Sequence, residues 1–117
     1  MISSISSTLS ALAAYGKKAG VTADNVANWQ SDEFKKSQAV FTEGENKTVE
    51  VEVRRIDTPG PIVDAVKDGE TVQKELSNVE LAEEIPQTVV TQRGYEANLK
   101  TIAVQDEMLK NIIDIVG

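Results

Sequence analysis

The sequence predicts a mainly α-helical fold with a small β segment: an elongated antiparallel two-helix coiled coil, formed by the N- and C-terminal helices and capped by a short β-hairpin region. Near both ends of the chain, residues recur at alternating steps of three and four, the spacing of a heptad seam along which one helix packs on another. Only five of the 117 residues are aromatic, so a thick globular core is not expected. A helix over residues 78–116 would be about 58 Å long, whereas a compact chain of this size is about 35 Å across.

The N-terminal helix is predicted over residues 3–28. Gly16 and Gly20 each weaken it by about 1 kcal/mol relative to alanine, while small residues on the seam let a second helix approach closely. A break near Gly20, with Thr22 capping a short second helix, is an open alternative. The seam positions of this helix are Ile2, Ile5, Leu9, Leu12, Gly16, Ala19, Ala23 and Val26.

A β segment is predicted after this helix. Residues 29–38 lose the heptad spacing and are expected to form an extended loop. A strand is expected to start at residues 39–41, before a turn-rich stretch at 43–46. Residues 48–54 alternate between apolar and polar side chains, which predicts a half-buried strand. The side chains expected to face inward are Val49, Val51 and Val53.

The second half of the middle segment is expected to contain little regular structure. Residues 57–61 hold two prolines and a glycine, which stop the strand and turn the chain. Residues 62–63 start at most a short third strand. Residues 64–76 are predicted to be a polar linker.

The order of these elements predicts one structural unit in three parts. They are an N-terminal helix and loop (1–38), a small β and turn segment (39–76) and a C-terminal helix (77–117). Because the two heptad helices flank the β segment, the chain must run out along one and return along the other. Met1 and Gly117 are therefore expected near each other, with the β segment at the opposite end.

The C-terminal helix is predicted to begin at a capping box, in which Ser77 and Glu80 satisfy each other's backbone N–H groups. Pro86 lies well inside the heptad pattern and is expected to produce a kink or a false start. The seam positions are Asn78, Leu81, Ile85, Thr88, Gln92, Tyr95, Leu99, Ile102, Asp106, Leu109, Ile113 and Val116. A second apolar line on the same helix consists of Val90, Ala97, Val104, Met108, Ile112 and Ile115.

These two lines on one helix indicate association with other molecules. One partner helix cannot cover both, so more than one neighbour is expected. Gln92 and Asp106 are polar residues at seam positions, where a dry core would disfavour them, and this favours a role in setting register and choice of partner. The spacing alone leaves a monomeric helical hairpin or a homodimer open.

Composition argues against several classes of function. The net charge of −7 argues against binding of nucleic acid, which needs a basic face. No apolar run approaches the length of a membrane span. The first seven residues have neither a basic segment nor a continuous apolar stretch, so no Sec-type signal peptide is expected.

An enzyme is not expected either. The chain has no histidine and no cysteine, which removes the usual general base, the thiol nucleophile and most transition-metal ligands. Adjacent Glu83 and Glu84 point to different faces of a helix and do not form a catalytic pair. No glycine-rich phosphate loop is present. We therefore expect no cofactor, no metal site and no small-molecule substrate.

Five stretches of the chain carry a resemblance to a known family. Residues 10–28 are S-A-L-A-A-Y-G-K-K-A-G-V-T-A-D-N-V-A-N, followed by F-K-K-S at 34–37. Residues 77–85 are S-N-V-E-L-A-E-E-I, residues 92–98 are Q-R-G-Y-E-A-N and residues 106–109 are D-E-M-L. These stretches resemble the N- and C-terminal signatures of the flagellar axial protein family, which comprises the rod and hook subunits of the bacterial flagellum.

The resemblance implies a structural subunit of a helical tube, closest in size to the proximal-rod subunits. Its terminal helices would pair as a coiled coil, polymerise and transmit torque in the periplasmic rod of the basal body. Its partners would be further copies of the chain, other flagellar axial proteins and the flagellar type III export apparatus, which releases such subunits without a cleaved signal. The alternative is a helical-hairpin adaptor or chaperone of a secretion system that forms a small oligomer.

Site residues are expected on the seams and in the family motifs. Asn25 and Asn28 are expected to cap the first helix, or to bond the following loop or an adjacent subunit. Glu33 stands where many family members have glycine, so that loop is expected to turn differently. The polar residues of the C-terminal motif form a solvated face or, as the resemblance implies, bridges between subunits; they are Gln92, Arg93, Glu96 and Asn98. The residues expected to mediate helix pairing and assembly are Ile5, Leu9, Leu12, Val26, Ile85, Tyr95, Leu99, Ile102, Leu109 and Ile113.

Overall fold

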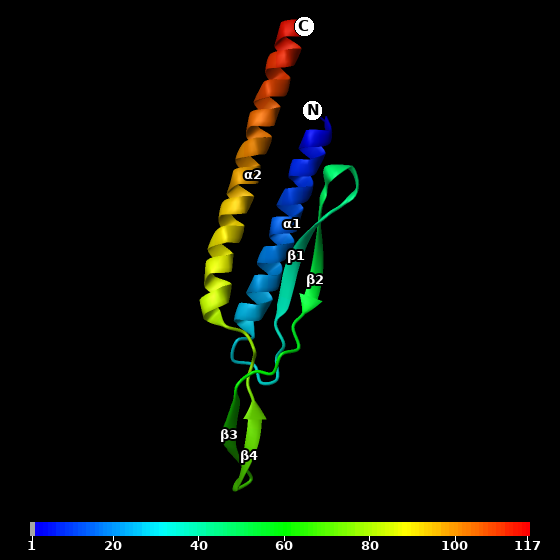
Figure 1. Cartoon of the computed structure of the whole chain (residues 1–117). Coiled ribbons are helices and arrows are strands. Elements are labelled where there is room, and N and C mark those ends of the chain that lie inside the picture. Colours follow the sequence, from blue (N-terminus) through cyan, green and yellow to red (C-terminus); the bar gives the residue numbers. More distant parts are fainter. Residues whose placement is uncertain (1) are drawn as a thin grey trace.

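Two antiparallel helices run side by side over the length of the shorter one (Figure 1). Helix α1 spans Ile2–Ala27 and helix α2 spans Leu81–Val116. The computed structural model describes residues 2–117, and its extents are 81 × 24 × 18 Å. The prediction of an elongated, mainly helical chain is therefore confirmed. Since residue 1 lies outside the described part, the expected position of Met1 is not described.

Helix α1 is continuous through Gly16 and Gly20, so the alternative of a break near Gly20 is wrong. The helix is covered on two sides, by α2 and by the first of two hairpins (Figure 1). Tyr15 contacts both neighbours. Its ring meets the Phe41 ring edge-on, with the centroids 4.9 Å apart. On the other side it lies against the backbone of Gly94 in α2. These contacts compensate for the low helix propensity of the two glycines, because tertiary packing supplies most of a helix's stability in a protein.

The first hairpin consists of strands β1 (Ser37–Glu43) and β2 (Val49–Arg55), which pair antiparallel. It lies along α1 and not at the end of the helices, so the predicted position of the β segment is wrong for this hairpin (Figure 1). The turn between them contains a short 3-10 helix, η1 (Glu45–Lys47). The Val49 N–H donates to Ser10 Oγ of α1 at 3.0 Å, which ties the hairpin to the helix. Val49 and Val51 are half-buried as expected, whereas Val53 is 44% exposed and corrects the prediction for that residue.

A second hairpin replaces the polar linker that was predicted over residues 64–76. Strands β3 (Ile62–Lys67) and β4 (Glu70–Glu75) pair antiparallel and project beyond the helices (Figure 1). Asp68 and Gly69 both have positive φ, 52° and 81°, as a tight two-residue hairpin turn requires. The Asp-Gly pair is therefore the sequence signal that the linker prediction missed.

Helix α2 begins at Leu81, and the predicted capping box is wrong. Glu80 holds the N-cap position without a side-chain cap, and Ser77 Oγ instead accepts the N–H of Val79 at 3.1 Å. The chain before the helix is buried and extended because its side chains bond other loops, as described below. The helix then passes through Pro86 without interruption, so the expected false start is also wrong.

Glu33 adopts the backbone conformation that glycine favours. Its φ is 59°, in the left-handed region. Its N–H donates to the Glu75 carbonyl at 3.1 Å, which holds the loop against the base of the second hairpin. The chain thus takes a left-handed turn here although the residue is not glycine.

The face that α2 presents to α1 is rotated from the predicted seam. Part of that seam is retained, because Leu81, Ile102 and Leu109 are half-buried. The other half has moved by one residue. The predicted seam residues of this second half are all exposed in the structure: Ile85, Gln92, Leu99, Asp106 and Ile113. The buried or half-buried residues that replace the first four of these are Glu84, Thr91, Asn98 and Gln105. The seven-residue period is kept, but polar rather than apolar side chains lie on the inner side.

Gly94 accounts for much of this rotation. A Cβ atom at Gly94 would overlap the Tyr15 ring, so the helices approach at a position where only glycine fits. By contrast, nothing lies within 4 Å of a Cβ built at Gly16 or Gly20. The contact between Tyr15 and the α2 backbone therefore fixes which face of α2 points inward.

We expect Gly94→Ala to lower the free energy of unfolding by about 1–2 kcal/mol, because the overlap with Tyr15 outweighs the better helix propensity of alanine. The matched control is Gly20→Ala, which gains the same propensity in open space and is expected to raise stability by about 1 kcal/mol. Urea denaturation followed by circular dichroism measures both. Equal gains at the two positions would contradict the role of Gly94 in helix packing.

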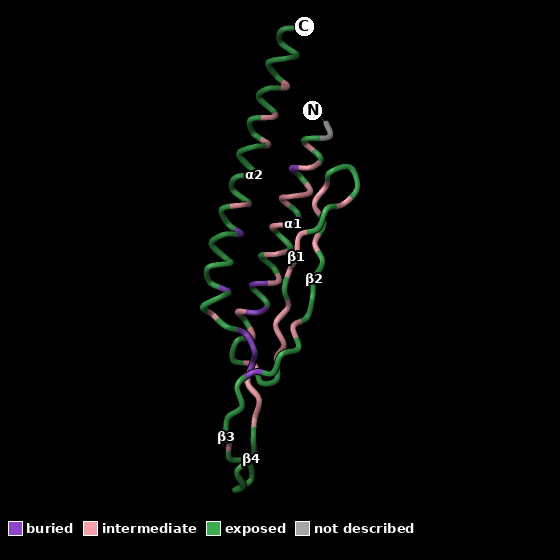
Figure 2. Tube along the Cα trace, viewed as in Figure 1, coloured by how far each residue is buried: buried purple, intermediate pink, exposed green. Residues whose placement is uncertain are grey.

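Little apolar surface is buried in the single chain. Among the residues whose side chains the structure describes, the buried apolar ones are Ala14 and Val79. The buried polar ones are Thr8, Thr22, Asn25, Ser77, Asn78, Glu84 and Thr91. Figure 2 shows several of these buried positions gathered where the helices, the hairpins and the loops meet. Neither described helix has a stretch apolar and long enough to cross a membrane.

Candidate functional site

A polar junction joins the ends of both helices to the loops of both hairpins; we define it by Asn25, Ser37, Asn78 and Glu84. Asn25, near the end of α1, is only 1% exposed. Its Oδ1 accepts the Ser37 N–H at 2.9 Å, and its Nδ2 donates to the Ser37 carbonyl at 2.8 Å. Nδ2 also donates to Glu84 Oε1 of α2 at 3.2 Å. One buried amide thus links α1, β1 and α2.

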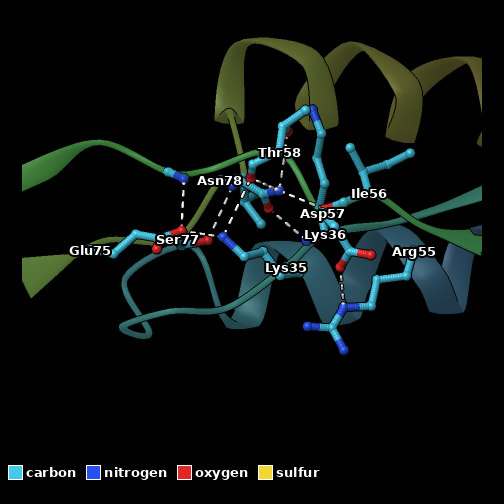
Figure 3. Close-up of polar contacts among 11 residues, drawn as sticks. Lys35, Lys36, Arg55, Ile56, Asp57, Thr58, Glu75, Ser77 and Asn78 are labelled. Atoms are coloured by element: carbon cyan, nitrogen blue, oxygen red, sulfur yellow. Dashed lines mark hydrogen bonds and ion pairs between the residues drawn. The ribbon is translucent and has the colours of Figure 1, made fainter.

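Asn78 makes the corresponding contacts on the other side of the junction (Figure 3). Its Oδ1 accepts the Lys36 N–H at 2.6 Å. Its Nδ2 donates to the carbonyls of Ile56 at 2.7 Å and Thr58 at 3.0 Å. Its own N–H donates to the Phe34 carbonyl at 3.2 Å. The neighbouring N–H groups of Lys36 and Ser37 therefore donate to two asparagines, one at the end of α1 and one just before α2.

Two ion pairs border the polar junction. Lys35 pairs with Glu75, whose Oε1 also accepts the Gly60 N–H at 3.0 Å. The hydrogen bond from Lys35, followed by that from Gly60, holds the pKa of Glu75 below its ordinary value of 4.5. Lys36 pairs with Glu83 at 2.7 Å and, chiefly through its side-chain hydrogen bond, lowers the pKa of Glu83.

We expect Glu75→Gln to destabilise the chain at pH 7, and the difference from the natural chain to shrink as the pH falls below about 4.5. A carboxyl group whose pKa is lower in the folded state contributes stability above its unfolded pKa, here about 4.5. This contribution is lost as the pH falls through the lower folded-state pKa. Thermal unfolding of the natural chain and of the variant between pH 7 and pH 3 measures how their stabilities approach each other. The control is Glu70→Gln, at an exposed position next to the turn of the same hairpin. A constant difference across this range would contradict the ion-pair origin.

Apolar side chains cover the outer face of α2. We call Ile85, Leu99 and Ile113 the first apolar line; they are 57%, 47% and 65% exposed. Along the second apolar line, defined above from Val90 to Ile115, the large side chains are also exposed. Burial of apolar area is the main favourable term in protein association. A single helix with two uncovered apolar lines therefore suits contact with more than one neighbour.

The predicted seam residues are divided between the inside and the surface of the chain. Ile5, Leu12, Val26, Ile102 and Leu109 are half-buried. Leu9, Ile85, Tyr95, Leu99 and Ile113 are exposed. The structure therefore brings half of these residues into intramolecular packing and leaves the others available to another molecule.

The polar motif residues have local partners. Asn28 Nδ2 donates to the Asp24 carbonyl at 2.9 Å, and Asn98 Nδ2 donates to the Gly94 carbonyl at 2.8 Å. Glu96 accepts hydrogen bonds from the two exposed side chains that precede it in the motif, Gln92 at 3.0 Å and Arg93 at 3.4 Å.

Sequence reasoning missed several members of the junction. Glu84 was assigned only to a helix face, and Ser37 was placed at the end of a loop. Asn78 was assigned to the helical seam, but the structure places it before the helix. The available signal was an asparagine next to the first turn of a predicted helix, a residue type that bonds nearby backbone readily. The partners of its side chain could not be found from sequence because they lie 20 to 42 residues away. Among the described residues, no group of three or more potential ligands is placed to hold a metal ion.

Comparisons with known proteins concern the C-terminal part of the chain. Residues 73–115 match the family described as flagellar basal body rod FlgEFG protein C-terminal. The flagellar hook protein FlgE of Borreliella burgdorferi is 46% identical over 39 residues, which is 33% of this chain and 9% of that protein. The flagellar basal-body rod protein FlgG of Bacillus subtilis is 39% identical over 41 residues, which is 35% of this chain and 16% of that protein. The similarity thus spans a small part of each relative.

Proposed function

We propose that this chain, whose C-terminal region is similar to the flagellar rod/hook family, is a structural subunit of the bacterial flagellar rod that polymerises through its terminal helices. The observation that carries the proposal is the outer face of α2. The region that matches the family, residues 73–115, includes most of the two exposed apolar lines. A helix that one partner cannot cover suits a subunit with several neighbours.

The polar junction supports a mechanical role. Asn25 and Asn78 hold the ends of both helices and the bases of both hairpins through bonds to backbone atoms. Buried and satisfied polar networks of this kind specify one geometry for the segments they join. A torque applied to the helices would pass through this junction to the hairpins, so the chain suits transmission of torque along a tube.

The finer parts of the proposal concern pairing, partners and location. Neighbouring copies would complete a coiled coil on the first apolar line, where Leu99 is half-covered in the single chain. Arg93 and Glu96, which lie exposed beside this line, would then bridge adjacent subunits. The partners would be further copies and other flagellar axial proteins. The chain would reach the periplasmic rod of the basal body through the flagellar type III export apparatus.

The first test measures polymerisation of the purified chain. Sedimentation velocity and electron microscopy over a concentration series should show growth into long assemblies. Ile85→Ser on the first line and Val90→Ser on the second should each raise the concentration needed for growth by about tenfold, whereas Lys100→Ser on the same helix should not. A small oligomer of fixed size at every concentration would instead favour an adaptor or chaperone of a secretion system.

The second test places the chain in the cell. Quantitative mass spectrometry of purified hook–basal bodies from the source organism should find it in a fixed ratio to other rod proteins. Absence from intact particles in cells that express the chain would contradict the rod assignment.

A further inference from the structure

The C-terminal end of α2 extends beyond the start of α1. Tyr15 lies against Gly94 and Asn25 against Glu84, a step of ten residues on each helix. Ile2, thirteen residues before Tyr15, therefore lies opposite residue 107, thirteen residues after Gly94. We call residues 108–116 the overhang; at about 1.5 Å per residue it is about 13 Å long. Figure 1 shows this end of α2 reaching past α1.

The overhang is apolar and, apart from half-buried Leu109, uncovered. Its exposed large apolar side chains are Met108, Ile112, Ile113, Ile115 and Val116. Two charged side chains lie in this segment, Lys110 and Asp114. Ile115 and Val116 are 84% and 83% exposed. A helix end with this composition needs an apolar surface on another molecule, because no other part of α1 or α2 lies alongside it.

A groove of about 680 Å³ lies between α1 and α2 farther along the molecule. Small residues form its α1 wall from Gly16 through Ala19 and Ala23, and the α2 wall includes Thr88, Thr91 and Tyr95. A Cβ built at Gly16 meets nothing within 4 Å, so the space above it is open. The wall runs from residue 16 to residue 26, about 15 Å along the helix. The groove is thus long enough for the overhang.

The α2 wall of the groove contains one buried polar group, the Thr91 hydroxyl. Thr91 is 3% exposed, and its hydroxyl has no hydrogen-bond partner among the described residues. A buried hydroxyl without a partner is unfavourable, and such groups are rare in native structures.

We propose that the overhang of one copy of this chain docks in the groove between α1 and α2 of a second copy. The occupant is a second copy because the overhang and the groove match in length and in apolar character, and because small residues on the α1 wall let a helix approach closely. The two surfaces are different and lie at different heights along the molecule. Such a contact is head-to-tail and, unless the rotation closes a ring, extends into an open filament. This inference rests on the proposed polymerisation and names the contact that produces it.

Engineered disulfides test this contact directly, because the natural chain has no cysteine. One copy carries Ala19→Cys in the groove, and a second copy with a distinguishable tag carries Ile112→Cys in the overhang. When the two are mixed under mild oxidation, we expect the mixed disulfide to form at least about tenfold faster than with the control partner Lys47→Cys, because docking raises the effective concentration of the two thiols. Lys47 is exposed in η1, away from the groove.

Sedimentation of the chain without cysteines, run in parallel, separates the two proposals. A fast 19–112 disulfide together with filament growth supports both. Filament growth with equal disulfide rates at residues 19 and 47 overturns the docking contact and leaves the structural role intact. A fast 19–112 disulfide in an assembly that stops at a small oligomer supports the docking contact and contradicts the tube. Equal rates without assembly overturn the docking contact and the polymerisation together.

Discussion

Replacing Asn25 with alanine is expected to lower the free energy of unfolding by about 2–4 kcal/mol, the largest effect of any single side chain considered for this molecule. The variant leaves the Ser37 N–H, the Ser37 carbonyl and the Glu84 carboxyl group without the partners they have in the folded chain. All three face a site where Asn25 is 1% exposed, so water cannot readily replace the lost bonds. Urea denaturation followed by circular dichroism measures the loss.

The control for this variant is Asn28→Ala, at an asparagine of the same helix end. Asn28 donates to the Asp24 carbonyl in the last turn of α1 and accepts from the Ser31 hydroxyl, and these bonds join residues close in sequence. We expect a loss of about 0.5–1 kcal/mol. A loss at position 25 no larger than at position 28 would contradict the central place of Asn25 in the junction.

Gly60→Ala is expected to lower the free energy of unfolding by about 2–3 kcal/mol, because overpacking against backbone cannot relax easily. A Cβ atom at Gly60 would overlap the Leu76 carbonyl and approach the Ser77 backbone carbon at 3.0 Å. These atoms belong to the buried segment that leads from β4 into α2. Relief of the overlap would shift Ser77 and its neighbour Asn78, whose bonds hold the junction together. Thermal and urea denaturation measure the effect.

The control for Gly60 is Gly44→Ala. A Cβ at Gly44 would also approach other atoms closely, but these are side-chain atoms of Thr48 at 2.7 Å and Glu50 at 2.8 Å. Side chains can turn away more readily than backbone can move, so we expect a change within about 0.5 kcal/mol. Similar losses at both positions would show that any close contact of the new Cβ atom has this effect. The loss at Gly60 would then not depend on the backbone next to the junction.

These variants illustrate how the single chain distributes its interactions. Its specific internal contacts are largely polar and concentrated at the junction, while the apolar lines of α2 stay on the surface. The hydrophobic contribution to stability is therefore incomplete in the isolated chain. Neighbouring subunits would supply it on assembly, so we expect assembled chains to unfold at a higher temperature than isolated ones.

Local patterns were sufficient to predict most elements. The heptad spacing predicted both helices, and α1 ends at Ala27 and α2 at Val116, within one residue of expectation. Alternation over residues 48–54 predicted β2, which spans residues 49–55. The second hairpin was also within reach of the sequence, because Asp68-Gly69 is the turn signal that was overlooked.

The sequence by itself determined that this chain is elongated, mainly helical and carries two apolar lines on its last helix, because these properties follow from residue periodicity along one element. Only the tertiary structure decided which face of α2 turns inward and where that helix begins. Both depend on contacts between residues distant in the chain: Tyr15 against Gly94 sets the rotation, and Asn78 with its loop partners keeps the chain extended up to Leu81. Periodicity cannot predict such pairs, because it shows which side chains of one helix can be buried together. It does not show which distant residue packs against them.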